Sequence, residues 1–304
     1  MSEKWDIQQP GESERDETVR VMAVGRSRGA IADARAAALR RYLHERGSES
    51  VRLWRAKSRR KTVAAAGVCE NPGRTGMLVH SPADAAGVKM EALSAVCAAA
   101  SDDALERGVS LVQSLELPEA EQDADALKKA GFRMLAELVY MRIATADVDE
   151  PTRDDIAWRR YGQFDEDELT RVIAATYEAS RDCPALSGVR RIEDVIAGHK
   201  AGGVFTPDMW WIIEHRDEPC GCVLVNDTSL PAVSEVVYLG VAPARRGARL
   251  GEALVRHACA AARRKGRDTL KLAVDASNTP ALRVYEKVGF RPVETRISYI
   301  KTAG

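Results

Sequence analysis

The chain has 304 residues, a length that predicts two domains, and hydrophobic residues make up 45% of it, so each half can bury a core. Lysine plus arginine equals aspartate plus glutamate, 45 to 45, and this balance gives no reason to expect nucleic acid or a membrane surface as a partner. No apolar run is long enough to span a bilayer, and we expect a cytoplasmic protein, monomeric or homodimeric.

The first 18 residues are charged and lack the apolar segment of a secretory signal, so we expect a flexible leader. The pattern that follows predicts a helix and then strands. These elements are expected at residues 31–46, 51–55, 62–69, 77–80 and 135–143. A polar segment, residues 145–156, reads as a linker between two domains.

The second half predicts the order β, α, α, β, β, β, α, β, α, β. The expected strands are residues 158–161, 210–215, 220–225, 236–241, 269–274 and 293–300. Amphipathic helices are expected at 165–180 and 191–200. A third helix ends at Gly266, and a fourth opens at Pro280 and ends at Gly289, because proline suits a helix start and glycine a helix end.

Two segments of the first half of the sequence resemble segments of the second half. His80-Ser-Pro82 followed by Gly87 resembles Val241-Ala-Pro243 followed by Gly247. Further on, the segment 128–133 resembles 286–291, with a Gly-Phe pair in each. Two matches in the same order and at nearly the same offset favour a tandem duplication, although two α/β halves can resemble each other by chance.

The six cysteines are scattered, mostly through apolar stretches, as small buried side chains would be. Cys220 and Cys222 have the wrong spacing for a zinc knuckle and no companion pair. We therefore expect free thiols in a reducing compartment and no metal site. The histidines are equally dispersed, and His257 is expected to be structural.

A turn with glycines joins the strand 236–241 to the third helix. Gly247 and Gly251 let backbone approach a ligand closely, and Arg245, Arg246 and Arg249 surround the turn. The unpaired N–H groups at the helix start and the helix dipole favour an anion there. Taken alone this pattern is weak, because many helix starts with glycines bind nothing.

The wider context is more specific. The run from the strand 236–241 through the glycine turn to Asn278-Thr-Pro-Ala281 and Tyr285 resembles the cofactor-binding half of GNAT-superfamily N-acetyltransferases. The resemblance covers residues 235–300 well and the rest of the second half more loosely. The tandem arrangement at this length is similar to that of the mycothiol synthase family. It implies an α/β fold of two tandem GNAT-like domains, each a central mixed β-sheet flanked by helices.

In this comparison residues 19–144 form a degenerate GNAT-like domain and 157–304 a catalytic one. Acetyl-CoA is the implied acyl donor. The implied cofactor-binding residues are Leu239, Gly240 and Val241 on the strand, Arg246, Gly247, Ala248, Arg249, Leu250 and Gly251 in the phosphate loop, and Asn278 and Ala281 at the next helix. The strand backbone would pair with the pantetheine arm, and Tyr285 would protonate the departing thiolate.

One position departs from the family pattern. Arg249 stands where the family has the middle glycine of the phosphate loop. The backbone N–H survives this change, but the space that a glycine leaves does not. Arg249 either points outward and adds charge near a phosphate or weakens binding.

An amine attacks a thioester only when neutral, so a general base is needed. Glu235, which opens the strand that leads to the phosphate loop, is the best candidate, because the tandem relatives carry a glutamate there. The alternative is a solvated glutamate at a strand start, with Glu214 as the second candidate base. Tyr285 could equally be a packing tyrosine, and Asn278 could equally be a helix cap.

The acceptor of a GNAT domain binds between the first helices and the hairpin. The candidates there are Tyr177, Asp182, Trp211 and Glu214. Their mixed character does not choose between a cationic and an anionic acceptor, and a surface turn and core aromatics are the alternatives. The first half lacks the parts for catalysis, since Leu127 stands at the place of Tyr285 and Ala120 at that of Asn278.

The sequence thus predicts an N-acetyltransferase that acts on the amine of a small molecule. Two alternatives stay open: a non-catalytic acyl-CoA-binding or sensing module, and a protein or peptide N-acetyltransferase. The acceptor itself does not follow from the sequence, because fold resemblance does not fix substrate.

Overall fold

The computed structural model describes residues 5–45, 47, 51–59, 61–186 and 188–303. The chain divides into two compact units. The first comprises Met1–Leu135 with Ile297–Gly304, and the second comprises Ala136–Arg296. Among the described residues, no helix combines the length and the apolar character needed to cross a bilayer.

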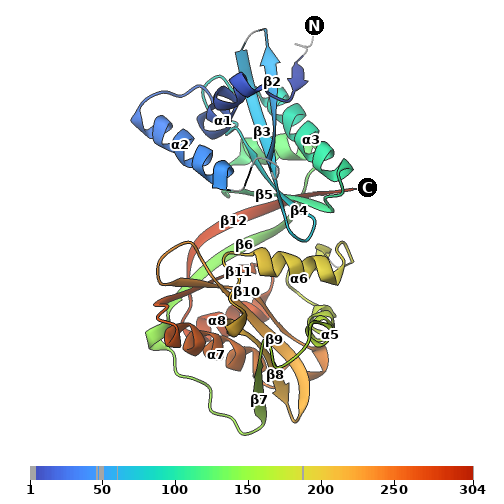
Figure 1. Ribbon diagram of the computed structural model, residues 1–304, viewed down its shortest axis with the longest axis vertical. Helices are drawn as coiled ribbons and strands as arrows, with labels where there is room; N and C mark the ends of the chain where they lie inside the picture. The colour runs from blue at the N-terminus through green and yellow to red at the C-terminus, as the bar shows by residue number, and fades with distance from the viewer. Residues whose placement is uncertain (1–4, 46, 48–50, 60, 187, 304) are drawn as a thin grey trace. The chain divides into compact units, whose positions relative to one another are not determined.

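The first unit is a mixed sheet between two layers of helices (Figure 1). Its strands are β1 (Asp6–Gln8), β2 (Val51–Ser58), β3 (Lys61–Asn71), β4 (Thr75–His80), β5 (Leu111–Glu116) and the end of β12 (Arg291–Thr302), in that order across the sheet. Helices α1 (Arg15–Val24) and α2 (Ala30–Glu45) pack on one face, and α3 (Met90–Glu106) and α4 (Glu121–Lys129) on the other. Only the β4–β5 pair is parallel among the strand pairs described in this unit.

The expected leader carries secondary structure from Asp6 onward. Strand β1 pairs antiparallel with β2, and Ile7 lies opposite Ala56. Helix α1 buries Val19 and Met22 against the sheet. The apolar residues of this segment have the spacing of a helix. The many charged residues around them make that pattern hard to recognise.

The second unit repeats the layered plan. Its strands lie in the order β6 (Arg133–Ala144), β11 (Thr269–Asp275), β10 (Val233–Val241), β9 (Glu218–Asp227), β8 (Trp210–His215) and β7 (Ile156–Arg160). Helices α5 (Glu166–Tyr177) and α6 (Ile192–Ala201) cover one face, and α7 (Leu250–Arg264) and α8 (Thr279–Val288) cover the other (Figure 1). The buried side of α7 is rich in alanine, which lets the helix pack closely on the sheet.

The strands that close the two repeats are exchanged between the compact units. Strand β6 ends the first repeat, yet it pairs with β11 of the second unit over Leu138–Ala144. The end of β12 belongs to the second repeat, yet Ile297–Thr302 pairs with β5 of the first unit. The domain boundaries at residues 144 and 157 therefore stay a prediction about the sequence repeat. The two compact units have different boundaries.

Strands β10 and β11 run parallel but separate early. Their pairing covers only Val233–Glu235 against Thr269–Lys271 among the described residues. A bulge between Val236 and Tyr238 interrupts the ladder of β10 with β9 just beyond this point. The end of β10 thus leaves β11 and exposes backbone groups on that side, which opens room within the sheet.

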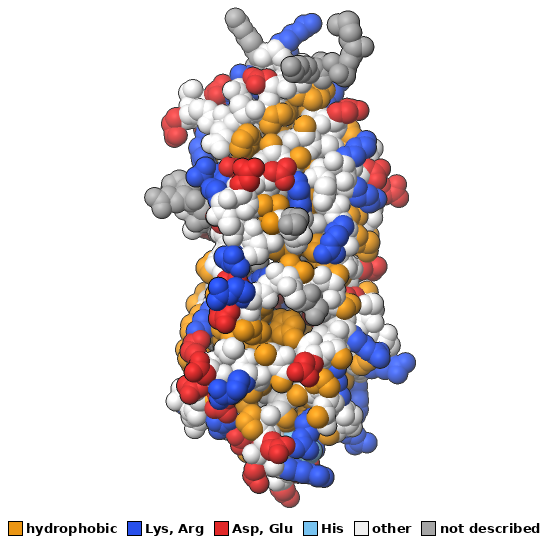
Figure 2. Space-filling model, turned by 90° about the vertical axis from the view of Figure 1, so that its right-hand side faces the viewer, with side chains coloured by type: hydrophobic (Ala, Val, Ile, Leu, Met, Phe, Trp, Pro, Cys, Tyr) orange, Lys and Arg blue, Asp and Glu red, His pale blue; other side chains and the backbone are white. Residues whose placement is uncertain are grey.

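All six cysteines are unbridged, as expected. On the face drawn in Figure 2, acidic and basic side chains are interspersed over both units. This agrees with the equal numbers of acidic and basic residues in the sequence.

Candidate active site

A cavity of about 770 Å³ lies in the second unit where β10 leaves β11. Its wall is formed by the end of β10, the start of α7, one face of α8 and the segment that follows α5. Of the predicted residues, those that line it are Leu239, Gly240, Val241, Arg246, Gly247, Arg249, Leu250, Gly251, Asn278, Ala281, Tyr285 and Asp182. The volume is within the range of small-molecule sites.

The phosphate loop places the first turn of α7 in the wall of this cavity. Gly247 has a φ of 88°, a conformation that glycine adopts without strain. A side chain added at Gly247 or Gly251 would meet no other atom within 4 Å, so the space above both residues is open. The N–H groups of the first turn of α7 lack helical partners and suit an anion there. Ala248 lies in the loop but faces a neighbouring hollow instead.

Arg249 is the residue before α7 and adopts a left-handed conformation, with φ 57° and ψ 23°. The side chain is exposed and lines the cavity, so it adds positive charge at the anion end. A glycine would adopt this backbone without cost, whereas a residue with a Cβ is strained by about 1–2 kcal/mol. The family's preference for glycine at this position therefore has a backbone reason.

Replacing Arg249 with glycine is expected to raise the free energy of unfolding by about 0.5–1 kcal/mol, because strain is relieved but the unfolded chain becomes more flexible. Arg249→Ala removes the same charge and keeps the strained backbone, so it serves as the matched control. Urea denaturation of the three proteins measures the difference. An alanine variant as stable as the glycine variant would show that the loop is not strained.

Arg246 holds the loop in place rather than facing the cavity with a free guanidinium. Its Nε donates to the carbonyl of Val241 at 3.0 Å, and its terminal nitrogens donate to backbone carbonyls just after α5. The shortest of these, to the carbonyl of Glu178, is 2.8 Å. A cation at a helix C-terminus also suits the helix dipole. Arg246 thus ties the phosphate loop to the end of α5.

The end of β10 forms the floor of the cavity. Gly240 lies against α5, and a Cβ there would come within 2.6 Å of the Cβ of Thr176 and 2.8 Å of the hydroxyl of Tyr238. The hydroxyls of Thr176 and Tyr238 are hydrogen-bonded to each other at 2.6 Å. Only glycine fits at this point, so the backbone of β10 stays close to α5 and the other side of the strand stays open.

Helix α8 brings two predicted residues to the wall of the cavity. Asn278 caps the helix, and its side-chain oxygen accepts a hydrogen bond from the N–H of Ala281 at 3.4 Å. Tyr285 lies further along and is 7% exposed. Burial, and then the nearby Asp182 carboxyl, raise the pKa of Tyr285 well above its usual range. The phenol therefore stays protonated across the physiological pH range and can donate a proton.

Two carboxyl groups hold the segment after α5 against the end of β11. Asp182 accepts a hydrogen bond from the N–H of Asp275 at 3.2 Å, and Asp275 accepts one from the N–H of Cys183, also at 3.2 Å. Burial raises the pKa of Asp182, although hydrogen bonds from Asp275 and from Asn278 act against that rise. Asp275 is not among the site residues that the sequence predicts. The polar break after the strand 269–274, which places Asp275 next to Ser277 and Asn278, is the pattern that could have indicated it.

Glu235 lies outside the lining of the cavity. It is on β10 four residues before Leu239, about 13 Å along an extended strand. The carboxylate forms an ion pair with Lys271 of β11 at 3.0 Å, and the Glu235 side chain is 31% exposed. Burial, and then the charge of Glu235, raise the pKa of Tyr140 on β6. Glu235 and its neighbours thus form a polar group on the sheet face opposite α7.

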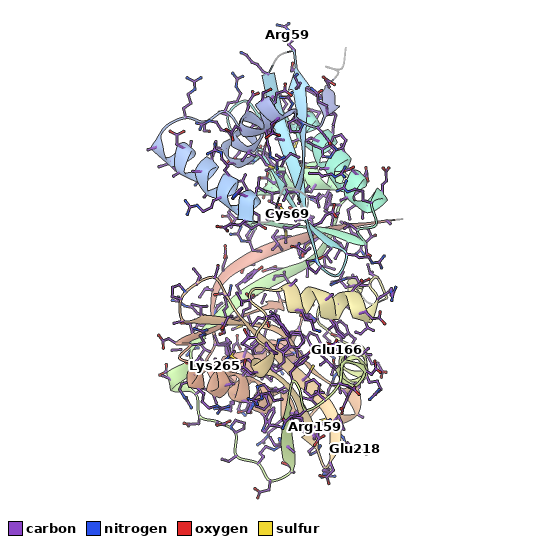
Figure 3. All side chains as sticks on the ribbon, in the orientation of Figure 1. Arg59, Cys69, Arg159, Glu166, Glu218 and Lys265 are labelled. Atoms are coloured by element: carbon purple, nitrogen blue, oxygen red, sulfur yellow. The ribbon has the colours of Figure 1, made fainter. Side chains whose placement is uncertain are left out.

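The remaining acceptor candidates are not brought together. Tyr177 stacks on Tyr238, with ring centroids 5.3 Å apart, beside the cavity wall. The ring of Trp211 instead packs edge to face against the ring of His257, in the core beneath α7. Glu214 is ion-paired at 2.6 Å with Arg159, which Figure 3 labels on β7, and neither lines the cavity.

The sequence model of the Acetyltransferase (GNAT) family matches residues 155–290. A mycothiol acetyltransferase of Amycolatopsis mediterranei is 31% identical over 183 residues, which is 56% of this chain and 59% of that protein. One of Streptomyces avermitilis is 29% identical over 172 residues, which is 56% of this chain and 54% of that protein. This chain thus matches little more than half the length of these relatives.

Two solved structures share the fold of almost the whole chain. A GCN5-related N-acetyltransferase from Sphaerobacter thermophilus has a TM-score of 0.61 at 17% identity, over 98% of this chain and 95% of that one. A tandem GNAT protein from the clavulanic acid biosynthesis pathway has a TM-score of 0.54 at 14% identity, over 99% of both chains. The predicted tandem fold is confirmed. Over residues 155–290, the chain is similar to the GNAT acetyltransferase family.

Proposed function

We propose that the protein is an acetyl-CoA-dependent N-acyltransferase that transfers an acetyl group to an amine of a small molecule. The observation that carries the proposal is the cavity, whose lining includes both an anion-receiving helix start and the buried phenol of Tyr285. A long donor with phosphates at one end and a reactive thioester at the other suits a cavity that offers both kinds of group.

Acetyl-CoA supplies the acyl group as an activated thioester. The first turn of α7 and the phosphate loop bind the diphosphate through backbone N–H groups. The open side of Leu239–Val241 on β10 is free to pair with the pantetheine amides as a further strand would. The N–H of Leu239 or Val241 can stabilise the oxyanion that forms on the thioester carbonyl.

Two side chains move protons in the proposed reaction. Tyr285 donates its proton to the thiolate as that group departs, which its raised pKa permits at neutral pH. Glu235 takes the proton from the attacking amine. The distance from Glu235 to the end of β10 requires that a water or the acceptor itself spans the gap. The acceptor therefore lies on the sheet face that Glu235 and Lys271 share.

The first unit supports the view that only the second repeat is catalytic. Strands β4 and β5 also separate early, since their pairing covers Thr75–Met77. Beyond this pairing, at the end of β4, the ring of His80 lies 3.1 Å from Glu116 and 3.7 Å from Asp123. Burial opposes protonation of His80, but these carboxylates outweigh it and raise its pKa. Charged groups are thus paired with one another at the ends of β4 and β5, the strands that correspond to β10 and β11 in the predicted repeat.

Titration calorimetry with acetyl-CoA, followed by a thiol-release assay over a panel of amines, tests the function. The panel includes the amine that acetylation converts into mycothiol, because the relatives carry that name, together with unrelated small amines and a peptide. Binding with release of thiol on a small amine is expected. Binding without release on any acceptor would favour a binding module, and absence of binding would refute the proposal.

A further inference from the structure

Two acidic side chains, Asp182 and Asp275, lie beside each other where the segment after α5 meets the end of β11. We call these two residues the acid pair. The carboxylate of Asp182 accepts a hydrogen bond from the N–H of Asp275 at 3.2 Å. The carboxylate of Asp275 accepts one from the N–H of Cys183 at 3.2 Å and one from the N–H of Ser277 at 2.8 Å. These bonds hold both carboxyl groups in place without bringing a positive charge to them.

The acid pair lacks a counter-ion. Neither of its carboxylates forms an ion pair with any residue that the structure describes. Glu252, the other carboxylate that lines the cavity, is by contrast paired with Lys287 at 2.6 Å. Asp275 is only 5% exposed, whereas Asp182 is exposed and lines the cavity. A negative charge held away from bulk water is costly unless a cation pairs with it, so a cation in the cavity would be stabilised beside Asp182.

Tyr285 gives an independent indication that a ligand belongs in this part of the cavity. The side chain is 7% exposed and lines the cavity, yet its hydroxyl forms no hydrogen bond with any residue in the described part of the chain. Phenol groups that are buried usually have a partner. Burial, and then the charge of Asp182, raise the pKa of Tyr285, so the two groups share one environment.

The acid pair stands on the side of the sheet where the acceptor is proposed to lie. Asp275 follows Lys271 by four residues on β11, and side chains alternate along a strand, so both belong to one face. Leu272 and Val274 belong to the opposite face and pack in the core with α7. The acid pair is therefore placed where the acceptor face meets the cavity.

We propose that the acid pair receives the acceptor as an alkylammonium ion, with Asp182 in contact with the ammonium group and Asp275 adding negative charge behind it. This inference rests on the proposed function. An aliphatic amine, like the side chain of lysine, is positively charged at pH 7 and suits a carboxylate that lacks a cation. An aromatic amine is a much weaker base and is neutral at this pH. The acceptor class is thus a basic aliphatic amine, and Asp182 selects it.

The acid pair binds and orients the amine and does not replace the base. The ammonium group loses one proton, through water, to Glu235 before its nitrogen attacks the thioester carbonyl, as in the proposed reaction. The neutral amine keeps an N–H that donates to the carboxylate of Asp182. Its lone pair is then left free to face the thioester.

Calorimetry on the protein saturated with CoA tests this assignment, because no acetyl transfer occurs in that complex. The probes are benzylamine with benzyl alcohol and aniline with phenol, so that each amine is compared with its hydroxyl analogue. The wild-type protein is expected to bind benzylamine about tenfold more tightly than benzyl alcohol, as a charge-assisted hydrogen bond implies, and aniline about as weakly as phenol.

Asp182→Asn should reduce the preference for benzylamine over benzyl alcohol to nearly one. Asparagine has almost the same size and keeps an oxygen that can accept the hydrogen bond from the N–H of Asp275, so the segment should stay in place. With an aliphatic amine that the enzyme acetylates, this variant should raise KM about tenfold and change kcat much less, because the contact is made before the reaction begins.

Asp165→Asn is the matched control. Asp165 caps α5 by accepting from the N–H of Glu168 at 2.7 Å, a task that asparagine performs equally well, and it does not line the cavity. The preference for benzylamine should be unchanged in this variant. A wild-type protein that binds benzylamine no more tightly than benzyl alcohol would overturn the assignment, and so would a full preference in Asp182→Asn. Either result leaves the acyltransferase proposal standing, whereas failure to bind acetyl-CoA would remove the proposed function itself.

Discussion

Replacing Tyr285 with phenylalanine is expected to lower kcat by about a hundredfold, because the departing thiolate loses its proton donor. The ring remains to fill its buried place against Phe290, so affinity for acetyl-CoA should stay nearly unchanged. Since the pKa of Tyr285 is raised and its protonated form is the active one, this group should cause no fall in kcat between about pH 7 and 10. Steady-state kinetics and calorimetry measure the two quantities.

Tyr161→Phe provides a control for loss of a phenol elsewhere in the same unit. Its hydroxyl donates to Glu166 at 2.6 Å, away from the cavity lining, so kcat should stay within a small factor of the wild-type value. Wild-type turnover in the Tyr285 variant would remove the proton-donor assignment. Equal losses in both variants would point to a general effect on folding.

Replacing Glu235 with glutamine is expected to lower kcat by about a hundredfold as well, by removing the base that accepts the proton of the amine. The amide of glutamine has nearly the same size but cannot accept the proton, so the loss should lie in kcat. Steady-state kinetics with an accepted amine measures it. Acetyl-CoA binding should be retained, because Glu235 does not line the cavity.

Glu214→Gln is the natural comparison, since it makes the same chemical change on the neighbouring hairpin. Glu214 is held by Arg159, which also pairs with Glu168, and these residues lie on the β7 side of the unit. Its replacement should leave kcat within a small factor of the wild-type value. Should kcat fall about a hundredfold in the Glu214 variant and stay at the wild-type value in the Glu235 variant, the base would have to be reassigned.

Much of the second unit could be predicted from local sequence signals. The structure gives α7 as Leu250–Arg264, β11 as Thr269–Asp275 and α8 as Thr279–Val288, close to the predicted bounds. Gly266, Pro280 and Gly289 mark the ends of these elements through the backbone they require or forbid. Helix α1 escaped prediction because its apolar positions stand among many charged residues.

The pairing of β6 with β11 could not be predicted in this way. The alternation of apolar residues shows that a strand exists, but it does not say which edge the strand covers. The partner of each closing strand is set by packing between segments that are far apart in the sequence.

The candidate site, too, could be predicted only where local sequence patterns specify it. Backbone requirements predicted a loop that lines the cavity, and the Asn278-to-Tyr285 spacing predicted two side chains that line it from α8. The reciprocal hydrogen bonds of Asp182 and Asp275 join segments far apart in the sequence, so no local pattern shows them. The same holds for Arg246, whose guanidinium is taken by carbonyls after α5.

The exchange of closing strands also bears on how the protein is made. The ribosome delivers residues 1–135 first, but the edge of β5 receives its partner only when Ile297–Thr302 has been synthesised. Until then β5 presents unpaired backbone groups, the kind of edge at which strands of different molecules associate. The first unit begins to be synthesised first, but it is completed only at the end of translation. We therefore expect nascent chains of this protein to depend on chaperones until translation is nearly finished.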